Sequence, residues 1–184
     1  MSIRLQDINT TNVLNLTDKL LVSNGSSENL VSVETFIGHT NLLFQGASTT
    51  SATLAGDANM HKYALTNVGL EVPNGASGMS IASGGVQVSA AGAYKITASL
   101  YMGYNTNGNG VYIFYGSSFT DGAPADTGAT ELCGQYDTSS KSSYHQVTGI
   151  VTNVPANTIF FLVGRSSTSS CTVNAGWLLV ERLA

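Results

Sequence analysis

The sequence predicts an all-β protein with an antiparallel sandwich in its C-terminal part and an extended or hairpin arm before it. Only 10% of the 184 residues are charged, whereas about a quarter is usual in soluble domains. Gly, Asn, Ser and Thr are abundant instead. Gly and Asn disfavour helix interiors, while Thr, Val, Ile and Tyr suit pleated strands. Short apolar runs also recur at intervals of roughly ten residues with turn-forming residues between them, which is typical of sandwiches.

The clearest strand lies in residues 93–103. Every second residue there is apolar, from Tyr94 and Ile96 to Met102, while Lys95 and the residues in step with it are mostly polar. This period of two predicts a half-buried strand. Further short strands are expected at 111–115, 131–136, 144–151 and 158–164, and a closing strand at 177–183. Residues 159–163 are apolar on both faces, as expected for a strand that is covered on both sides or packed at a subunit interface.

The first 45 residues follow a different pattern. Apolar residues occur there in short runs with no sustained period, and Asn24-Gly25 predicts a tight turn between strands 19–22 and 30–36. We expect residues 1–45 to form an anchoring arm that needs a partner surface. Residues 46–59 are mostly small and are typical of a linker. The sandwich is then expected over residues 60–184.

Several of these strands resemble the C1q/TNF-like jelly rolls. Ala91-Gly92-Ala93-Tyr94-Lys95-Ile96-Thr97-Ala98 resembles a strand of that family, and residues 147–162 and 175–180 resemble its later strands. The resemblance implies a jelly-roll topology and a homotrimer. Large apolar side chains of the sandwich are expected at the trimer interface: Tyr94, Tyr112, Phe114, Phe160, Leu162 and Trp177.

The arm resembles the leader segments of tailed-phage fibre and head-fibre proteins. Asp18-Lys19-Leu20-Leu21-Val22 is followed by a polar turn and by a second apolar strand at 30–36. This implies a virion appendage that binds the major capsid protein or another virion protein. Its anchoring side chains would be Leu20, Leu21, Val22, Leu30, Val31 and Phe36.

The sequence contains no repetitive shaft between the arm and the sandwich. We therefore expect a capsid decoration protein, either a cement protein or a head fibre. The alternative is a tail-fibre tip that recognises host surface glycans through the loops 104–110 and 120–128.

Chemistry-bearing motifs are absent from the sequence. It contains no nucleophile elbow, phosphate loop or paired carboxylates, so we expect no catalytic residues, no cofactor and no enzyme, a depolymerase included. His39, His61 and His145 are dispersed and do not form a metal motif. Asp121 and Asp126 bracket a loop that could hold calcium, although such loops are usually plain turns.

Charge and hydropathy limit the possible partners. The net charge is −4, and the seven Lys and Arg residues form no cluster, which argues against a nucleic-acid partner. No apolar run is long enough to span a bilayer, so no membrane insertion is expected. The N-terminus lacks the layout of a signal peptide. We expect the protein to be made in the host cytoplasm and carried on the exterior of the particle.

Overall fold

The computed structural model describes residues 19–23, 28–32, 42–72, 77–103, 108–124, 127–138, 142–167 and 169–183. The chain divides into two units, Met1–Thr40 and Asn41–Ala184. We describe each unit by itself.

The first unit contains a two-stranded antiparallel sheet. Strand β1 (Lys19–Ser23) pairs with β2 (Glu28–Ser32), with Leu21 opposite Leu30. The predicted hairpin in the arm is therefore confirmed. Phe36, which we expected in the second strand and among the anchoring residues, lies outside the described residues.

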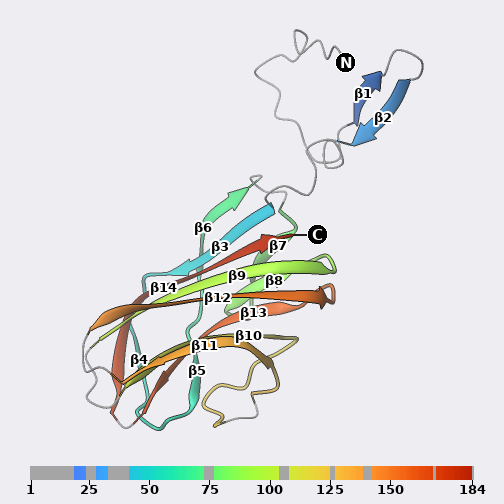
Figure 1. Cartoon of the computed structure of the whole chain (residues 1–184). Helices are drawn as coiled ribbons and strands as arrows, with labels where there is room; N and C mark the ends of the chain where they lie inside the picture. The colour runs from blue at the N-terminus through green and yellow to red at the C-terminus, as the bar shows by residue number, and fades with distance from the viewer. Residues whose placement is uncertain are drawn as a thin grey trace. The chain divides into compact units, whose positions relative to one another are not determined.

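The second unit is a sandwich of two antiparallel sheets (Figure 1). The first, which we call the β9 sheet, has the order β12-β9-β14-β3-β6, and β4 also pairs with β14. Its strands are β3 (Leu42–Ser48), β4 (Ala52–Leu54), β6 (Asn67–Val72), β9 (Gly92–Met102), β12 (Ser143–Val154) and β14 (Cys171–Arg182).

The second sheet, the β13 sheet, has the order β11-β10-β13-β8-β7, and β5 also pairs with β13. Its strands are β5 (Met60–Lys62), β7 (Met79–Ala82), β8 (Gly85–Val88), β10 (Asn109–Gly116), β11 (Thr130–Asp137) and β13 (Ile159–Ser166). Most neighbouring strands in the two sheets are far apart in sequence, which is the connectivity of a jelly roll rather than of a simple meander.

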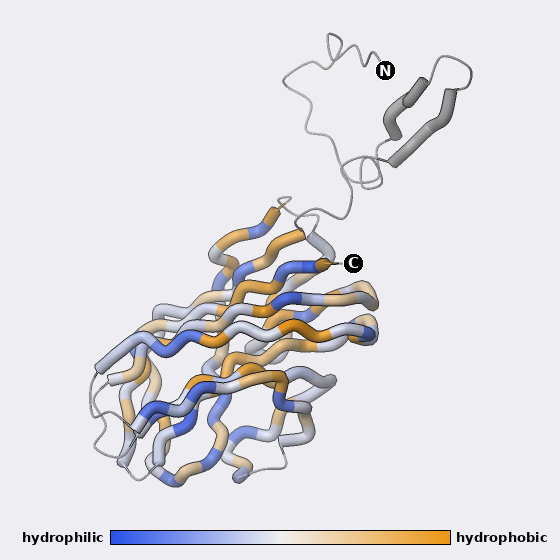
Figure 2. The backbone as a smooth tube through the Cα atoms, in the orientation of Figure 1, coloured by the Kyte–Doolittle hydropathy of each residue, from blue (hydrophilic) through white to orange (hydrophobic). Residues whose placement is uncertain are grey.

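The core lies between the two sheets. The alternation predicted in strand β9 is confirmed, since Tyr94, Ile96, Ala98, Leu100 and Met102 are all buried. Phe160 and Leu162 of β13 face them within the same cluster. Hydrophobic stretches along the strands of the sandwich are visible in orange in Figure 2.

A second apolar cluster covers the outer face of the β13 sheet. Tyr112 and Phe114 of β10 lie there with Ile159, Phe161 and Val163 of β13. Met60 of β5 and Phe119 of the β10–β11 loop pack over them, and Phe119 contacts both Phe114 and Phe161. Strand β13 is therefore covered on both faces within one chain, which is the first of the two alternatives predicted for residues 159–163.

The predicted arm boundary at residue 45 and the linker at 46–59 are wrong. Strand β3 begins at Leu42 and pairs with both β14 and β6, and β4 at Ala52–Leu54 also pairs with β14. The small residues in this stretch serve close packing. A Cβ on Gly46 would lie 2.7 Å from Ile81 Cδ1 and 2.9 Å from Leu65 Cδ1.

Candidate functional site

The outer face of the β9 sheet presents side chains from five strands. Tyr144, Gln146, Thr148 and Ile150 of β12 lie opposite Tyr101, Ser99, Thr97 and Lys95 of β9. The same rows continue across β14 through Ala175, Trp177, Leu179 and Glu181, and across β3 through Ala47, Gln45 and Leu43. They end on β6 at Asn67, Leu70 and Val72. We call this surface the open face.

Large apolar side chains of the open face are exposed. Tyr144 is 70% exposed, Ile150 62% and Leu70 44%. None of its outward-facing apolar residues belongs to either hydrophobic cluster of the described residues. This distinguishes the β9 sheet from strands β10 and β13 of the other sheet, whose outer apolar side chains pack in the second cluster.

The open face is almost neutral. Its charged residues, Lys95 and Glu181, pair with each other at 3.5 Å. Two further contacts join β9 to β12: the Thr97 and Thr148 hydroxyls are 3.0 Å apart, and the rings of Tyr101 and Tyr144 are 4.7 Å apart. The open face thus combines aromatic and aliphatic side chains with uncharged polar ones, and a low content of charged residues is typical of the buried centre of a protein interface.

The structure corrects most of the predicted interface residues. Tyr94, Phe160 and Leu162 are buried between the two sheets of one chain, so they cannot contact a second subunit. Tyr112 and Phe114 are 8% and 4% exposed within one chain, where they belong to the second cluster and Phe119 of the β10–β11 loop contacts Phe114. Trp177 is the one predicted residue on the open face, where it is half-buried between Ser99 and Ala47.

Sequence reasoning missed Ile150 and Leu70 as surface residues. A signal for Ile150 was present: Tyr144 and Ile150 stand in the same alternating set as the polar Gln146 and Thr148. That set is exposed, so its apolar members are exposed too.

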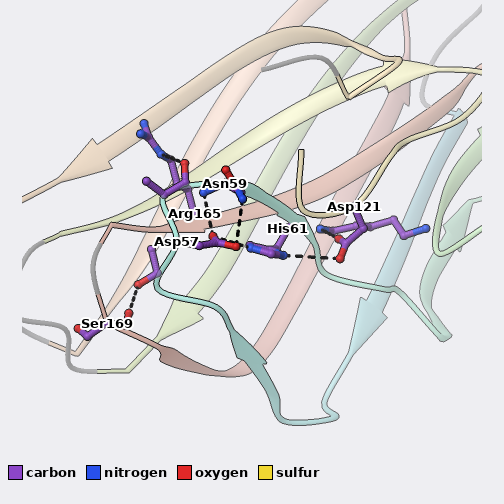
Figure 3. Close-up of polar contacts among 9 residues, drawn as sticks. Asp57, Asn59, His61, Asp121, Arg165 and Ser169 are labelled. Atoms are coloured by element: carbon purple, nitrogen blue, oxygen red, sulfur yellow. Dashed lines mark hydrogen bonds and ion pairs between the residues drawn. The ribbon is translucent and has the colours of Figure 1, made fainter. Parts of the chain in front are cut away.

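A polar cluster around His61 lies where strand β5 meets the β10–β11 loop, beside the β13 sheet. His61 sits between two carboxylates, with Nε2 2.9 Å from Asp57 Oδ1 and Nδ1 3.6 Å from Asp121 Oδ2 (Figure 3). Hydrogen bonding to His61, together with the Asn59 backbone, holds the pKa of the Asp57 carboxyl below its ordinary value of 3.8. The Lys62 backbone N–H donates to Asp121 Oδ1 at 2.6 Å.

These contacts tie the β10–β11 loop to strand β5. Met60 and the loop also exchange backbone hydrogen bonds, from Met60 N to Ala123 O and from Gly122 N to Met60 O. The cluster therefore holds the β10–β11 loop beside the outer apolar side chains of the β13 sheet. This is a structural role. Among the described residues, no group of three His, Cys, Asp or Glu side chains could hold a metal ion. Asp121 is engaged as described above, and Asp126, its expected partner in a calcium loop, lies outside the described residues.

We expect His145 to make the stability of the sandwich depend on pH. It is 4% exposed, and Ser143 Oγ lies 3.0 Å from its Nε2. Burial lowers the pKa of His145 from its ordinary value of 6.5, and the Asp137 carboxylate opposes this. Below pH 6.5 the unfolded chain takes up a proton that the folded chain excludes, so stability falls with falling pH.

We expect the urea midpoint of the wild type to fall between pH 7.5 and pH 5.0. In His145→Gln the fall should be smaller, because no proton is taken up at this position. Chemical unfolding at several pH values measures both. An unchanged pH slope in His145→Gln contradicts the assignment of the effect to this residue.

No known protein family matches the sequence, and no curated protein matches it either. Solved structures do match the sandwich. Eiger TNF from S. frugiperda is 13% identical, with coverage of 78% of this chain and 93% of that chain and a TM-score of 0.52. Murine APRIL at pH 8.0 is 11% identical, with coverage of 77% and 99% and a TM-score of 0.54. The PRD1 vertex protein P5 is 14% identical, with coverage of 80% and 99% and a TM-score of 0.48.

At these identities the likeness to Eiger TNF and APRIL shows the fold alone. The predicted all-β fold with a C1q/TNF-like jelly roll is confirmed. In the part of the chain that is described, no helix is long and apolar enough to cross a membrane.

Proposed function

We propose that this chain is a structural protein of a virus particle that forms a homotrimer through the open face and attaches through its N-terminal arm. The observation that carries the proposal is the contrast between the two sheets. Strands β10 and β13 are buried on both faces by their own chain, with Tyr136 of the edge strand β11 39% exposed, whereas the β9 sheet presents Tyr144, Ile150 and Leu70 to solvent. Exposed large apolar side chains on one sheet face, here spread from the β12 edge to the β6 edge, mark a candidate interaction site.

Copies of the same chain are the proposed occupants of the open face. The face is neutral apart from one internal ion pair, so like copies approach it without charge repulsion. A trimer is also what the resemblance to C1q/TNF-like jelly rolls implies. Burial of apolar side chains from three copies would stabilise the assembly by roughly 25 cal/mol for each Å² removed from water, before the cost of association.

The arm provides the proposed attachment. Strands β1 and β2 form a two-stranded hairpin, which is marginally stable in water by itself and gains from a partner surface. The apolar residues Leu20, Leu21, Val22, Leu30 and Val31 belong to these strands, in the segment that resembles phage fibre leaders. A trimer carries three arms, so each weak contact with a shell gains from the high effective concentration set by the others. A capsid decoration role is preferred to a tail-fibre tip, because the sequence has no repetitive shaft.

The trimer is tested by Ile150→Lys. The wild type is expected to have three times the 19.1 kDa mass of one chain in solution. Ile150→Lys places three like charges in the interface and should give a folded monomer. Light scattering measures the mass, and circular dichroism checks the fold. Ser80→Lys, at an exposed position of β7 on the other sheet, is the matched control and should remain a trimer. A monomeric wild type, or an unchanged trimer in Ile150→Lys, contradicts the proposed interface.

Location on the particle is tested by imaging. An antibody against the sandwich, applied to particles of the virus that encodes the chain, should label the head in negative-stain micrographs. Label on the tail would replace the capsid decoration role with the tail-fibre role. Unlabelled particles that lack the protein in a mass-spectrometric inventory would overturn virion attachment altogether.

A further inference from the structure

A hollow lies at one end of the sandwich, beside the turn between β12 and β13. Its volume is about 370 Å³, within the range of small-molecule sites. Three segments form it: the end of β10, the start of β11 and the β12–β13 turn. Its lining residues are Tyr115, Gly116, Ser117, Thr130, Pro155, Ala156, Asn157 and Thr158.

The hollow combines an aromatic wall with a fixed turn. Tyr115 is half-buried, and its ring centroid is 6.1 Å from that of Phe160 in the core, so the ring is held in place. Asn157 adopts a left-handed backbone with φ 64°. Its N–H donates to Val88 O at 2.8 Å, and its carbonyl accepts from Gln87 Nε2. The turn therefore holds Asn157 at the rim without using its side-chain amide.

Four polar side-chain groups around the hollow are left for a ligand. The Tyr115, Ser117 and Thr130 hydroxyls and the Asn157 amide make no hydrogen bond within the described part of the chain. Thr158 differs, because its hydroxyl donates to Pro155 O at 2.8 Å. Hydroxyls and amides both donate and accept, so the free groups suit a ligand that carries several hydroxyls.

None of the eight lining residues is charged. A charged ligand would leave water without gaining an opposite charge, which is costly. A purely apolar ligand would cover polar groups without satisfying them. A ligand that suits both the aromatic wall and the free groups is neutral and ring-shaped, with one apolar C–H face and hydroxyls at its edge.

We propose that this hollow binds a neutral sugar ring, which stacks on Tyr115 and hydrogen-bonds to Ser117, Thr130 and Asn157. The site lies within one copy of the chain, so it depends neither on the trimer nor on the arm and goes beyond the proposed function. A single ring in an open site binds at about millimolar Kd.

The test is a titration of the isotope-labelled full-length chain with methyl glycosides of glucose, galactose, mannose and N-acetylglucosamine, followed by NMR. At least one of them, at about 50 mM, well above a millimolar Kd, should shift the amide signals of Gly116, Ser117 and Asn157. N-acetylneuraminic acid, which is charged, should not shift them. Absence of shifts with all four glycosides, or equal shifts with the charged sugar, overturns the proposal.

The matched control uses a second hollow, which shares Pro155 with the first. That hollow is lined by Ala91–Ala93 and Thr152–Pro155, without an aromatic wall. Asn153 lines it and is also left-handed, with φ 58°. Asn157→Gly and Asn153→Gly therefore each remove a side-chain amide from a position where the backbone accepts glycine equally well. Asn157→Gly combined with Ser117→Ala should weaken binding at least tenfold, and Asn153→Gly should leave it unchanged. Equal sugar affinity in the wild type, the double variant and Asn153→Gly contradicts the proposed site.

Discussion

We expect removal of residues 1–45 to unfold the sandwich and removal of residues 1–40 to leave it folded. The longer deletion takes away the first four residues of β3, which pair with Leu179–Arg182 of β14 and with β6. It also removes Phe44, which is 1% exposed in the core. Loss of a buried Phe side chain alone costs about 3–5 kcal/mol. With the lost strand pairing, the total approaches the whole stability of about 5–15 kcal/mol of a typical domain.

The two deletions are compared by circular dichroism and urea unfolding. The 1–40 deletion is the control, because it ends within one residue of the boundary between the two units. Its sandwich should unfold at the same urea concentration as that of the full-length chain. It should also lose binding to virus particles if the arm is the anchor. A 1–45 deletion that unfolds like the control would contradict the place of β3 in the sheet.

We expect Phe160→Ala to lower the thermal midpoint of the sandwich by about 6–20 °C. Phe160 is fully buried, and its ring lies 5.9 Å from that of Tyr94 and 6.1 Å from that of Tyr115. Truncation of a buried Phe costs about 3–5 kcal/mol, and 1 kcal/mol corresponds to about 2–4 °C in a domain of this size. Phe160→Ala should be combined with Ile150→Lys, which is expected to make the chain monomeric. The fall in the thermal midpoint should then not depend on protein concentration.

Trp177→Ala is the contrasting variant, because Trp177 lies on the open face rather than between the sheets. We expect the trimer of this variant to dissociate at higher protein concentrations than the wild-type trimer. The thermal midpoint of the monomer should change much less. Thermal melts over a range of concentrations separate the two cases, since only an assembly has a concentration-dependent midpoint. If Phe160→Ala changed only the concentration dependence, Phe160 would lie at an interface and not in the core.

Local pattern predicted the strands well but not the environment of their faces. Alternation in residues 93–103 predicts that Tyr94 and Ile96 share one face of β9 and that Lys95 and Thr97 share the other. It does not say whether the apolar face meets the second sheet of the same chain or a second chain. Tyr94 and Phe160 were expected at a subunit interface for this reason, and the structure pairs them with each other inside one sandwich.

Composition was a poor guide where small residues pack closely. Residues 46–59 are predicted as a linker because Gly, Ala, Ser and Thr dominate there. Gly46 is small because Ile81 of β7 and Leu65 of the segment between β5 and β6 approach it. Nothing within ten residues of Gly46 signals that approach, since the contact forms only when β3 packs against β7 and β8 of the other sheet.

The hollow beside Tyr115 and the open face could not be predicted from local sequence either, because each is assembled from distant segments. Tyr115, Thr130 and Asn157 come from three segments that the chain brings together at one end of the sandwich, and no spacing in the sequence relates them. The open face is likewise assembled from five strands between Leu43 and Glu181.

The sequence by itself determined that the chain is all-β, where most strands of the sandwich lie and that β1 and β2 form a hairpin, because alternation and turn chemistry are properties of neighbouring residues. Only the tertiary structure decided that β3 and β4 belong to the sandwich and that Tyr112 and Phe114 are buried within one chain. It alone also placed Tyr144 and Ile150 on an exposed sheet face. The physical reason is that burial depends on which distant segment covers a face, and that is settled by strand order and loop packing across the whole domain.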